Sequence, residues 1–474
     1  MMYRAWTHSW TQGLSAGPKA NGRRRNHTIA SCPGAQSLTE QDGLSQLRLF
    51  TGTLAREGHE VALDVRILID ETGEIVFAFD PILLSDRTQF LLTTFHERGS
   101  RIRPLRFSGV APDETRFSTD NFHFTRCGIA SEESDVHLNV AGSCLFGVFH
   151  RTLDTPASRP LLRMHLRGFE NFPCHETTSR LGTVGIVGSD SRANPDKLTG
   201  WIAISPTDTP KDFAAWRADA ERLLEHVRRV MSFAASSLLR APIIECYANG
   251  EVEIRVWSQT ARISSGIRTI HHLQQNEIFL AAVASFENPP VAAKHFFFAI
   301  EWFAMESTYN EIRLVCAMTA LENLLDANLD SSEALIQPKK EFKRTSSVLS
   351  VVMRICIRLW SHGNASEVSR DLAAKLADLN RRSFRWKLRT LASRWGVPLT
   401  GISENALRDA INARNRVVHR GQYYEGPEPD DADLWTHVTV IREVVVRFIF
   451  TIIGYRGKYA SYLGDLHDAD FPPT

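Results

Sequence analysis

Hydrophobic residues follow one spacing before about residue 270 and another after it. From about 46 to 206, apolar and polar positions alternate in short runs, which clusters of Gly, Pro, Ser and Asp separate. Alternation of this kind is typical of strands that bury one face. In the clearest run the apolar residues are Val61, Leu63, Val65, Ile67 and Ile69. We therefore predict an antiparallel β-rich domain, built as a sandwich or a barrel.

Two further elements complete this N-terminal half. A helix is expected over about 211–238, and a hairpin follows it whose turn is Asn249-Gly250. Asn-Gly favours a two-residue hairpin turn, since both residues tolerate positive φ. The two strands are expected at 243–247 and 251–256, and the second one alternates Val, Ile and Val with charged residues.

After about 270 the apolar spacing becomes that of helices. Proline and glycine break the pattern at Pro289-Pro290, at Pro338 and at 396–398, and an acidic loop breaks it at 421–433. Helices are predicted at 271–286, 291–306, 309–328, 340–361, 365–381, 383–395, 403–420 and 431–453, with no further strands. The expected fold class is therefore α+β, with a β-rich domain at 46–268, an all-α bundle at 270–460 and a tail at 461–474.

Composition is that of an ordinary soluble globular protein. The chain has 474 residues, of which 43% are hydrophobic and 23% charged, so two or three domains are expected. The seven cysteines are scattered and form no CxxC pair, which favours reduced thiols in a cytoplasm over a disulfide scaffold or a zinc site. The most apolar run, 434–454, contains charged residues, so we expect a buried helix and no membrane partner.

The N-terminal 45 residues differ from the rest in charge. The first 39 contain no Asp or Glu, but carry Arg4, Lys19, Arg23, Arg24 and Arg25. Neither an amphipathic helix nor an apolar signal core accompanies these charges. We expect 1–45 to be a disordered extension or to result from a start codon assigned too far upstream.

The candidate chemistry lies in one sextet, Arg414-Asn415-Arg416-Val417-Val418-His419, on the predicted helix 403–420. It combines a permanent cation, an amide and the one side chain that ordinarily titrates near neutral pH. Asn415 and His419 are four residues apart and share a helix face. Arg414 lies about 140° from His419 around the axis, within reach of a long side chain or a distorted last turn. These groups could hold and cleave a phosphodiester without metal.

A structural interpretation of the same residues stays open. His419 and Arg420 suit the negative end of a helix dipole, and Gly421 is a typical helix stop. In that interpretation, the helix is only an amphipathic element whose core face carries Leu407, Ala410, Ile411, Val417 and Val418.

Local charge favours a polyanionic ligand. The whole chain is nearly neutral, with 55 Lys+Arg against 54 Asp+Glu. Within 381–420, however, ten basic residues are opposed only by Glu404 and Asp409. Aromatic residues are interleaved among them, a mixture that suits backbone phosphates and stacked bases. The candidate RNA-binding residues are Arg385, Lys387, Arg408, Arg416 and Arg420.

Two other motifs are weaker signals. The glycine-rich run 182–188 matches neither a Walker loop nor a dinucleotide fingerprint, so we expect turns and close backbone packing there. Glu322, in Ala320-Leu321-Glu322-Asn323-Leu324-Leu325, could support an active-site cation or could be a surface carboxylate that pairs helices.

The final helices resemble the C-terminal HEPN domain of ApeA-like proteins, a bacterial anti-phage abortive-infection family. The resemblance is carried by 384–388, by Leu407 and by 414–421, with the 320–325 helix, and it spans about 290–460. The β-rich half, including 166–172, resembles more loosely the domain that often precedes such HEPN domains. In that family an Arg-x-x-x-x-His motif marks metal-independent ribonucleases, and it maps here onto Arg414, Asn415 and His419.

The resemblance implies an endoribonuclease that acts in phage defence. RNA supplies its own 2′-OH nucleophile, so no metal or cofactor is expected, and His419 would act as general base or acid. Arg414 would hold the scissile phosphate, and Asn415 would orient the phosphate or the imidazole. The resemblance also implies a homodimer that shares one cleft, and a phage-derived trigger for the β-rich domain. Two alternatives stay open: a non-catalytic helical dimer that binds nucleic acid or nucleotide, and an interaction protein whose β-domain senses a phage product.

Overall fold

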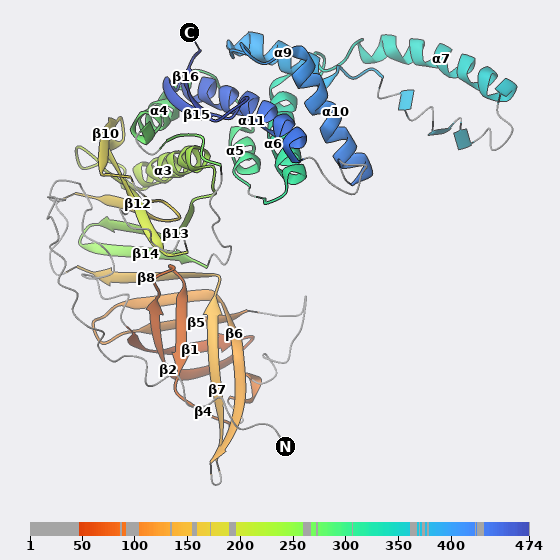
Figure 1. Ribbon diagram of the computed structural model, residues 1–474. Helices are drawn as coiled ribbons and strands as arrows, with labels where there is room; N and C mark the ends of the chain where they lie inside the picture. Colours follow the sequence, from red (N-terminus) through yellow and green to blue (C-terminus); the bar gives the residue numbers. More distant parts are fainter. Residues whose placement is uncertain are drawn as a thin grey trace.

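The computed structural model describes most of the chain after residue 46. The described residues are 47–473, except 86–87, 92–103, 133–134, 154–158, 171, 189–195, 259–266, 272–273, 306, 361–366, 369, 372–374, 377–378, 422 and 424–430. The predicted extension 1–45 thus lies outside the described residues. Strands and helices separate along the molecule as expected, with the β-rich part at one end and most helices at the other (Figure 1).

The N-terminal strands form a closed barrel. Its strands are β1 (Arg48–Arg56), β2 (His59–Ile69), β3 (Ile75–Phe79), β5 (Leu105–Val110), β6 (Arg116–Glu132) and β7 (Asp135–Cys144). They are hydrogen-bonded in the order β6-β5-β1-β2-β3-β7, and β7 pairs back with β6 to close the ring. A short strand β4 (Ile82–Leu83) pairs antiparallel with β7. The barrel alternative of the predicted β-domain is therefore confirmed.

Alternation explains why the barrel has an apolar interior. Along β5, Leu105 and Phe107 are buried while Arg106 and Ser108 are exposed, as period-two spacing requires. Inside, Phe77 packs edge-on against Phe122 with ring centroids 5.0 Å apart, one of several phenylalanine contacts there. Such edge-to-face pairs are the preferred aromatic geometry.

The sheet continues from the barrel into an open part. β8 (Phe146–Thr152) pairs with β6, and beyond it the order is β14-β13-β9-β12-β11-β10, with every pairing antiparallel. These strands are β9 (Leu161–Arg167), β10 (His175–Ser179), β11 (Gly182–Gly188), β12 (Leu198–Ser205), β13 (Arg240–Ala248) and β14 (Glu251–Trp257). The predicted hairpin is β13–β14, and its turn residues Asn249 and Gly250 have φ of 54° and 78°.

The glycine-rich run is strand β11, between β10 and β12. A Cβ at Gly182, whose φ is 136°, would lie 2.1 Å from the Ser205 carbonyl oxygen, so only glycine fits there. Close backbone packing is therefore confirmed at this position, whereas the turns expected over 182–188 are wrong, because the run forms a strand.

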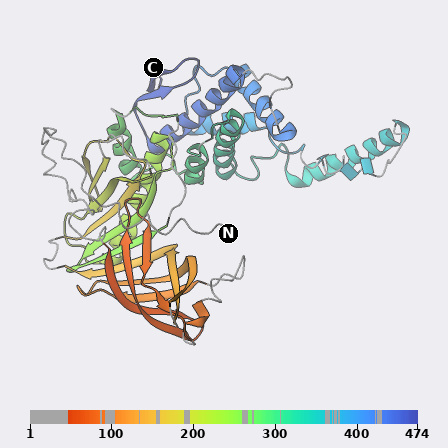
Figure 2. The ribbon, with the colours of Figure 1, turned by 60° about the horizontal axis from the view of Figure 1, so that its bottom comes forward.

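The helices enclose a core that joins the open sheet to the C-terminal half. α3 (Phe213–Ala235) begins at Asp212, whose side chain accepts a hydrogen bond from the Ala215 amide at 3.0 Å, and it packs on β9 and β12. The other helices are α4 (Gln275–Glu287), α5 (Phe296–Phe303), α6 (Asn310–Asn328), α7 (Lys339–Trp360), α9 (Phe384–Trp395), α10 (Glu404–Arg420) and α11 (Asp431–Ile453). α11 packs against α4, α5, α6 and α10, while α7 extends away from the rest (Figures 1 and 2).

Two expectations are corrected. Strands do not end at 270, because β15 (Gly457–Ser461) and β16 (His467–Phe471) form a hairpin where the end of the all-α bundle and a tail were expected. Their local sequence shows little alternation; the hairpin is fixed instead by Tyr459 and Phe471, whose buried rings lie 5.2 and 5.1 Å from that of Phe450 on α11. Cys174 is disulfide-bonded, so the expectation of reduced thiols is wrong at that position. Among the described helices, none has the length and hydropathy needed to cross a membrane.

Candidate functional site

The helix that carries the sextet, α10, begins and ends close to the residues predicted from the sequence. The Ser403 side chain accepts a hydrogen bond from the Ala406 amide at 3.1 Å, which caps the first turn of α10. Gly421, with φ of 76°, ends the helix, and its amide donates to the Val417 carbonyl oxygen at 2.9 Å. Leu407, Ala410 and Ala413 are buried, on the side that packs against α6 and α11.

Arg414 makes the main contact of the sextet with another helix. Its Nη2 donates to both carboxylate oxygens of Glu322 on α6, each at 3.0 Å, and its Nη1 donates to Asn415 Oδ1 at 3.3 Å. The side chains of Arg414 and Glu322 are 23% and 35% exposed, so the pair lies at the edge of the solvent. Arg414 Nε finds no hydrogen-bond partner among the described residues. Glu322 therefore supports the sextet cation and pairs two helices at once.

Most side chains that follow Arg414 on α10 are exposed to solvent. Asn415, Arg416, His419 and Arg420 are exposed. Val418, expected in the core, is 50% exposed, because the buried residues of α10 end at Ala413. In the described part of the chain, no hydrogen bond or ion pair joins His419 to Arg414 or to Asn415. The structure therefore brings together Arg414, Asn415 and Glu322 and leaves His419 one turn away, on the same exposed face as Asn415.

Carboxylates from α6 and nearby residues reduce the local basic excess. Lys387 Nζ lies 2.6 Å from Asp326 Oδ1, and its side chain is only 17% exposed. Because Asp326 follows Glu322 by four residues, one face of α6 binds the cations of both α9 and α10. Three other arginines of 381–420 also form ion pairs, namely Arg389 with Glu404, Arg394 with Glu333 and Arg408 with Asp409. A count along the chain misses Glu322, Asp326 and Glu333, because they come from another segment.

The remaining candidate RNA-binding residues differ in their surroundings. Arg385 is exposed on α9, and the guanidinium of Arg416 lies 5.9 Å from the ring centroid of Tyr423. Arg416 and Arg420 flank His419 on the last turn of α10. Lys387 and Arg408 are already ion-paired, so a phosphate would have to compete for them.

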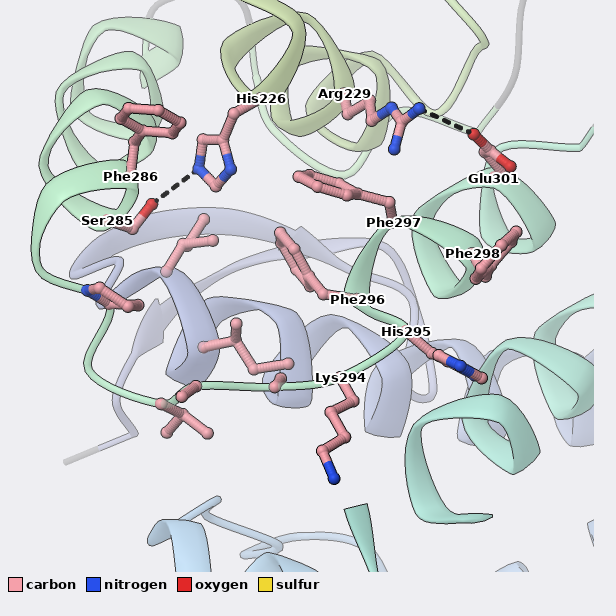
Figure 3. Close-up of a pocket in the computed structure, with 16 residues that line it drawn as sticks. His226, Arg229, Ser285, Phe286, Lys294, His295, Phe296, Phe297, Phe298 and Glu301 are labelled. Carbon is pink, nitrogen blue, oxygen red and sulfur yellow. Dashed lines mark hydrogen bonds and ion pairs between the residues drawn. The ribbon is translucent and has the colours of Figure 1, made fainter. Parts of the chain in front are cut away.

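A separate cavity of about 600 Å³ lies between α3, α4, α5 and the end of α11 (Figure 3). His226 Nε2 lies 3.0 Å from Ser285 Oγ at its wall, and burial, together with the charge of Arg229, lowers the pKa of His226 to about 4. Arg229 stacks on Phe297 at 4.4 Å and lies 3.7 Å from Glu301. Scattered positions build this cavity, and the run Phe296-Phe297-Phe298 is the one sequence feature that could have indicated it.

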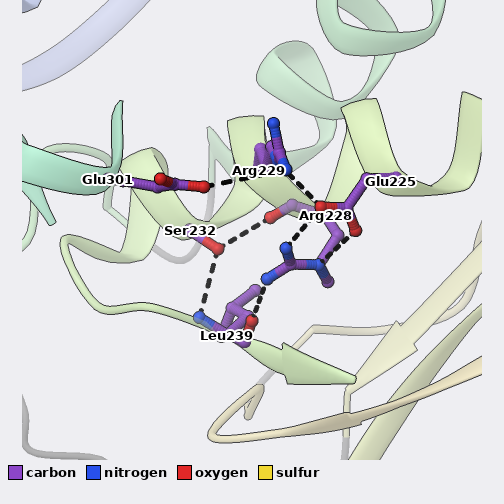
Figure 4. A network of polar contacts seen from close by, with 6 residues as sticks. All are labelled: Glu225, Arg228, Arg229, Ser232, Leu239 and Glu301. Atoms are coloured by element: carbon purple, nitrogen blue, oxygen red, sulfur yellow. Dashed lines mark hydrogen bonds and ion pairs between the residues drawn. The ribbon is translucent and has the colours of Figure 1, made fainter. Parts of the chain in front are cut away.

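Several polar contacts lie along α3 next to this cavity. Glu225 accepts hydrogen bonds from Arg228 at 2.6 Å and from Arg229 at 2.6 Å (Figure 4). Ser232 Oγ accepts from the Leu239 amide at 3.1 Å, which ties the start of β13 to α3. The cavity is lined mostly by apolar residues, and of its two histidines, His226 and His295, His226 contacts Ser285 and has a lowered pKa.

The open sheet contains a second arginine–glutamate–histidine group. Arg163 Nε donates to Glu245 Oε2 at 2.6 Å, and His165 Nε2 lies 3.1 Å from the same oxygen. Burial alone raises the pKa of Glu245, but the charges of His165 and Arg163 more than offset this, so the pKa lies below its ordinary value. The side chains of Arg163, His165 and Glu245 are 4%, 7% and 0% exposed, so no substrate reaches them.

Comparisons with protein-family models, with curated proteins and with solved structures find no match to this chain.

Proposed function

We propose that this protein is a metal-independent endoribonuclease whose site is formed by Arg414, Asn415 and His419. The observation that carries the proposal is the position of Arg414, held by Glu322 at the solvent edge, on a helix that exposes Asn415 and His419 one turn apart. A guanidinium with remaining donors and an accessible imidazole are the groups that phosphodiester cleavage requires.

The reaction follows from the chemistry of RNA. The 2′-oxygen attacks the adjacent phosphorus, the bond from phosphorus to the 5′-oxygen breaks, and the products are a 2′,3′-cyclic phosphate and a 5′-hydroxyl end. One group removes the 2′-OH proton and another protonates the leaving 5′-oxygen. His419 performs one of these transfers, a role worth about 10²–10⁴ in rate. Arg414 donates to the phosphate oxygens as negative charge develops on them.

A second copy of the chain would supply the other proton transfer. One imidazole does not conveniently act as base and acid in a single step. Two sextets placed across a twofold axis would provide two histidines, and His419 is exposed at the end of α10, where a partner can approach. Sedimentation tests this version, because a strict monomer that still cleaves RNA contradicts it.

The resemblance to ApeA-like proteins is the sole support for a role in phage defence. In that proposal the barrel senses a phage product or restrains the nuclease. Cells that carry the Arg414→Ala variant should lose protection against phage that wild-type cells show.

A non-catalytic helical module is the second candidate function. It is favoured by the ion pair between Arg414 and Glu322, because this pair engages the guanidinium that a phosphate would otherwise bind. The ion pairs of Lys387 and Arg408 favour it for the same reason. Such a module would bind nucleic acid or a protein without cleaving RNA.

An assay of RNA cleavage by the purified full chain in EDTA distinguishes the ribonuclease from the non-catalytic module. His419→Ala should lower the rate at least about 100-fold without changing the unfolding midpoint, since His419 is exposed. His467→Ala, at another exposed histidine on β16, is the matched control and should keep full activity. No cleavage by the wild type would reject the enzyme in favour of the module, and equal cleavage by both variants would reject His419 as a catalytic group.

A further inference from the structure

The helix α7 belongs to an arm that leaves and re-enters the body at one point. The Ile336 amide donates to the Asn380 carbonyl oxygen, and the Arg382 amide donates to that of Ala334, both at 2.8 Å. The buried Asn380 side chain closes the base, because it accepts from the Gln337 amide at 2.8 Å and donates to the Gln337 carbonyl oxygen at 2.9 Å. Residues 338–379 therefore form an insertion whose ends are joined.

The arm displays an apolar stripe to solvent. Val348, Val352, Ile355 and Leu359 are spaced four, three and four residues apart, so they share one face of α7. Their exposed fractions are 66%, 52%, 54% and 68%, and α7 projects away from the body in both views (Figures 1 and 2). Apolar side chains at this density on one helix face are a mark of an interaction surface.

The charge of α7 indicates the kind of partner that would bind it. Its described basic side chains, Lys339, Lys340, Lys343, Arg344 and Arg354, are opposed within the helix by Glu341 alone. None of the five forms an ion pair with another described residue. A helix that combines a basic face with an apolar face matches an anionic surface that also offers a hydrocarbon layer.

We propose that the arm docks on an anionic lipid bilayer, with the apolar stripe of α7 in the headgroup–acyl boundary and its basic residues at the phosphates. A second copy of α7 would cover the apolar stripe but would leave the basic residues without an anionic partner. RNA would bind the basic residues but would leave the apolar stripe in water. This inference is independent of the proposed nuclease activity, and it replaces the expectation that no membrane takes part.

Sedimentation of the full chain with vesicles tests the proposal. The protein should pellet with vesicles of phosphatidylcholine mixed with phosphatidylglycerol, should stay in solution with phosphatidylcholine alone, and should be released by high salt. The double variant Val352→Asp, Ile355→Asp should bind about tenfold more weakly or worse, because two charges would enter the apolar layer.

Two controls keep the result interpretable. Ile129→Asp, at a residue 63% exposed on the barrel strand β6, should bind as the wild type does. Replacement of 339–378 by a short Gly-Ser linker should abolish vesicle binding and leave the unfolding midpoint of the body unchanged. The proposal is overturned if the wild type ignores anionic vesicles, or if the double variant binds them equally well. It is overturned too if the double variant converts a dimer to a monomer without any vesicle binding by the wild type, which would identify a second copy as the partner.

Discussion

The molecule contains two groups made of the same three residue types, and they differ in access to water. Arg163, Glu245 and His165 lie inside the open sheet, with the Glu245 side chain fully buried. Arg414 and Glu322 lie at the solvent edge of the helices, with His419 exposed one turn further along α10. The sealed group can only stabilise the sheet, whereas the open group is accessible to solvent, as the proposed binding of a phosphate requires. Accessibility, more than residue type, decides which group can perform chemistry.

The largest difference between the two groups should appear in stability. Glu245→Ala leaves Arg163 and His165 buried without their carboxylate, and this should cost about 3–5 kcal/mol of unfolding free energy. Glu322→Ala removes the partner of a partly exposed arginine and should cost less than about 1 kcal/mol. Urea unfolding followed by near-UV circular dichroism measures both. Equal losses would show that the helical pair is as structural as the buried one.

Catalysis should depend on the shape of the open group. Arg414→Lys keeps the charge but loses the planar set of donors, so RNA cleavage should fall about 100-fold. The matched control is Arg389→Lys, in another ion-paired arginine of the same region, and its rate should match that of the wild type. Full activity of Arg414→Lys would mean that only charge is required at this position.

His226 extends the comparison to a third site, because it is a buried histidine that stays neutral. Its pKa is about 4 in the folded protein, against an ordinary value of 6.5. Between these values unfolding takes up a proton, so stability is complete above pH 6.5 and falls as pH drops toward 4. From pH 7 to pH 5 the loss from this group should be about 2 kcal/mol. His226→Gln should remove that part of the pH dependence, as measured by urea unfolding at both pH values; an unchanged profile would assign the acid sensitivity elsewhere.

Local elements of the fold were predictable from the sequence. α10 begins after Ser403 and ends at Gly421 because each of these residues hydrogen-bonds to a backbone group within about one helical turn. The β13–β14 hairpin follows from Asn249-Gly250 for the same reason. These features depend on spacing and backbone preference, which are properties of a few adjacent residues.

Features that depend on distant partners were not predictable in this way. Closure of the barrel requires β6 to pair with β5, β7 and β8, and nothing in the alternation of one strand specifies its neighbours. Glu322 and Arg414 are 92 positions apart, so the sequence allowed two interpretations of Glu322 without deciding which cation it meets. Val418 fits an apolar helix face by spacing, but α10 extends past its packing partners there.

The smallest expected effect concerns the ion pair that occupies the open site. A phosphate must displace Glu322 from Arg414 Nη2 before that donor can reach it. Glu322→Gln keeps the shape and removes the charge, so the Kd for RNA should fall about two- to fivefold, within the energy of a partly exposed pair. Fluorescence anisotropy of labelled RNA measures this in a His419→Ala background, where the substrate stays intact. Glu333→Gln is the matched control, because it removes the same charge from Arg394, which is not a candidate RNA-binding residue. Equal tightening by both variants would point to the general charge of this region, and weaker binding by Glu322→Gln would show that Glu322 orients Arg414 for RNA instead of competing with it.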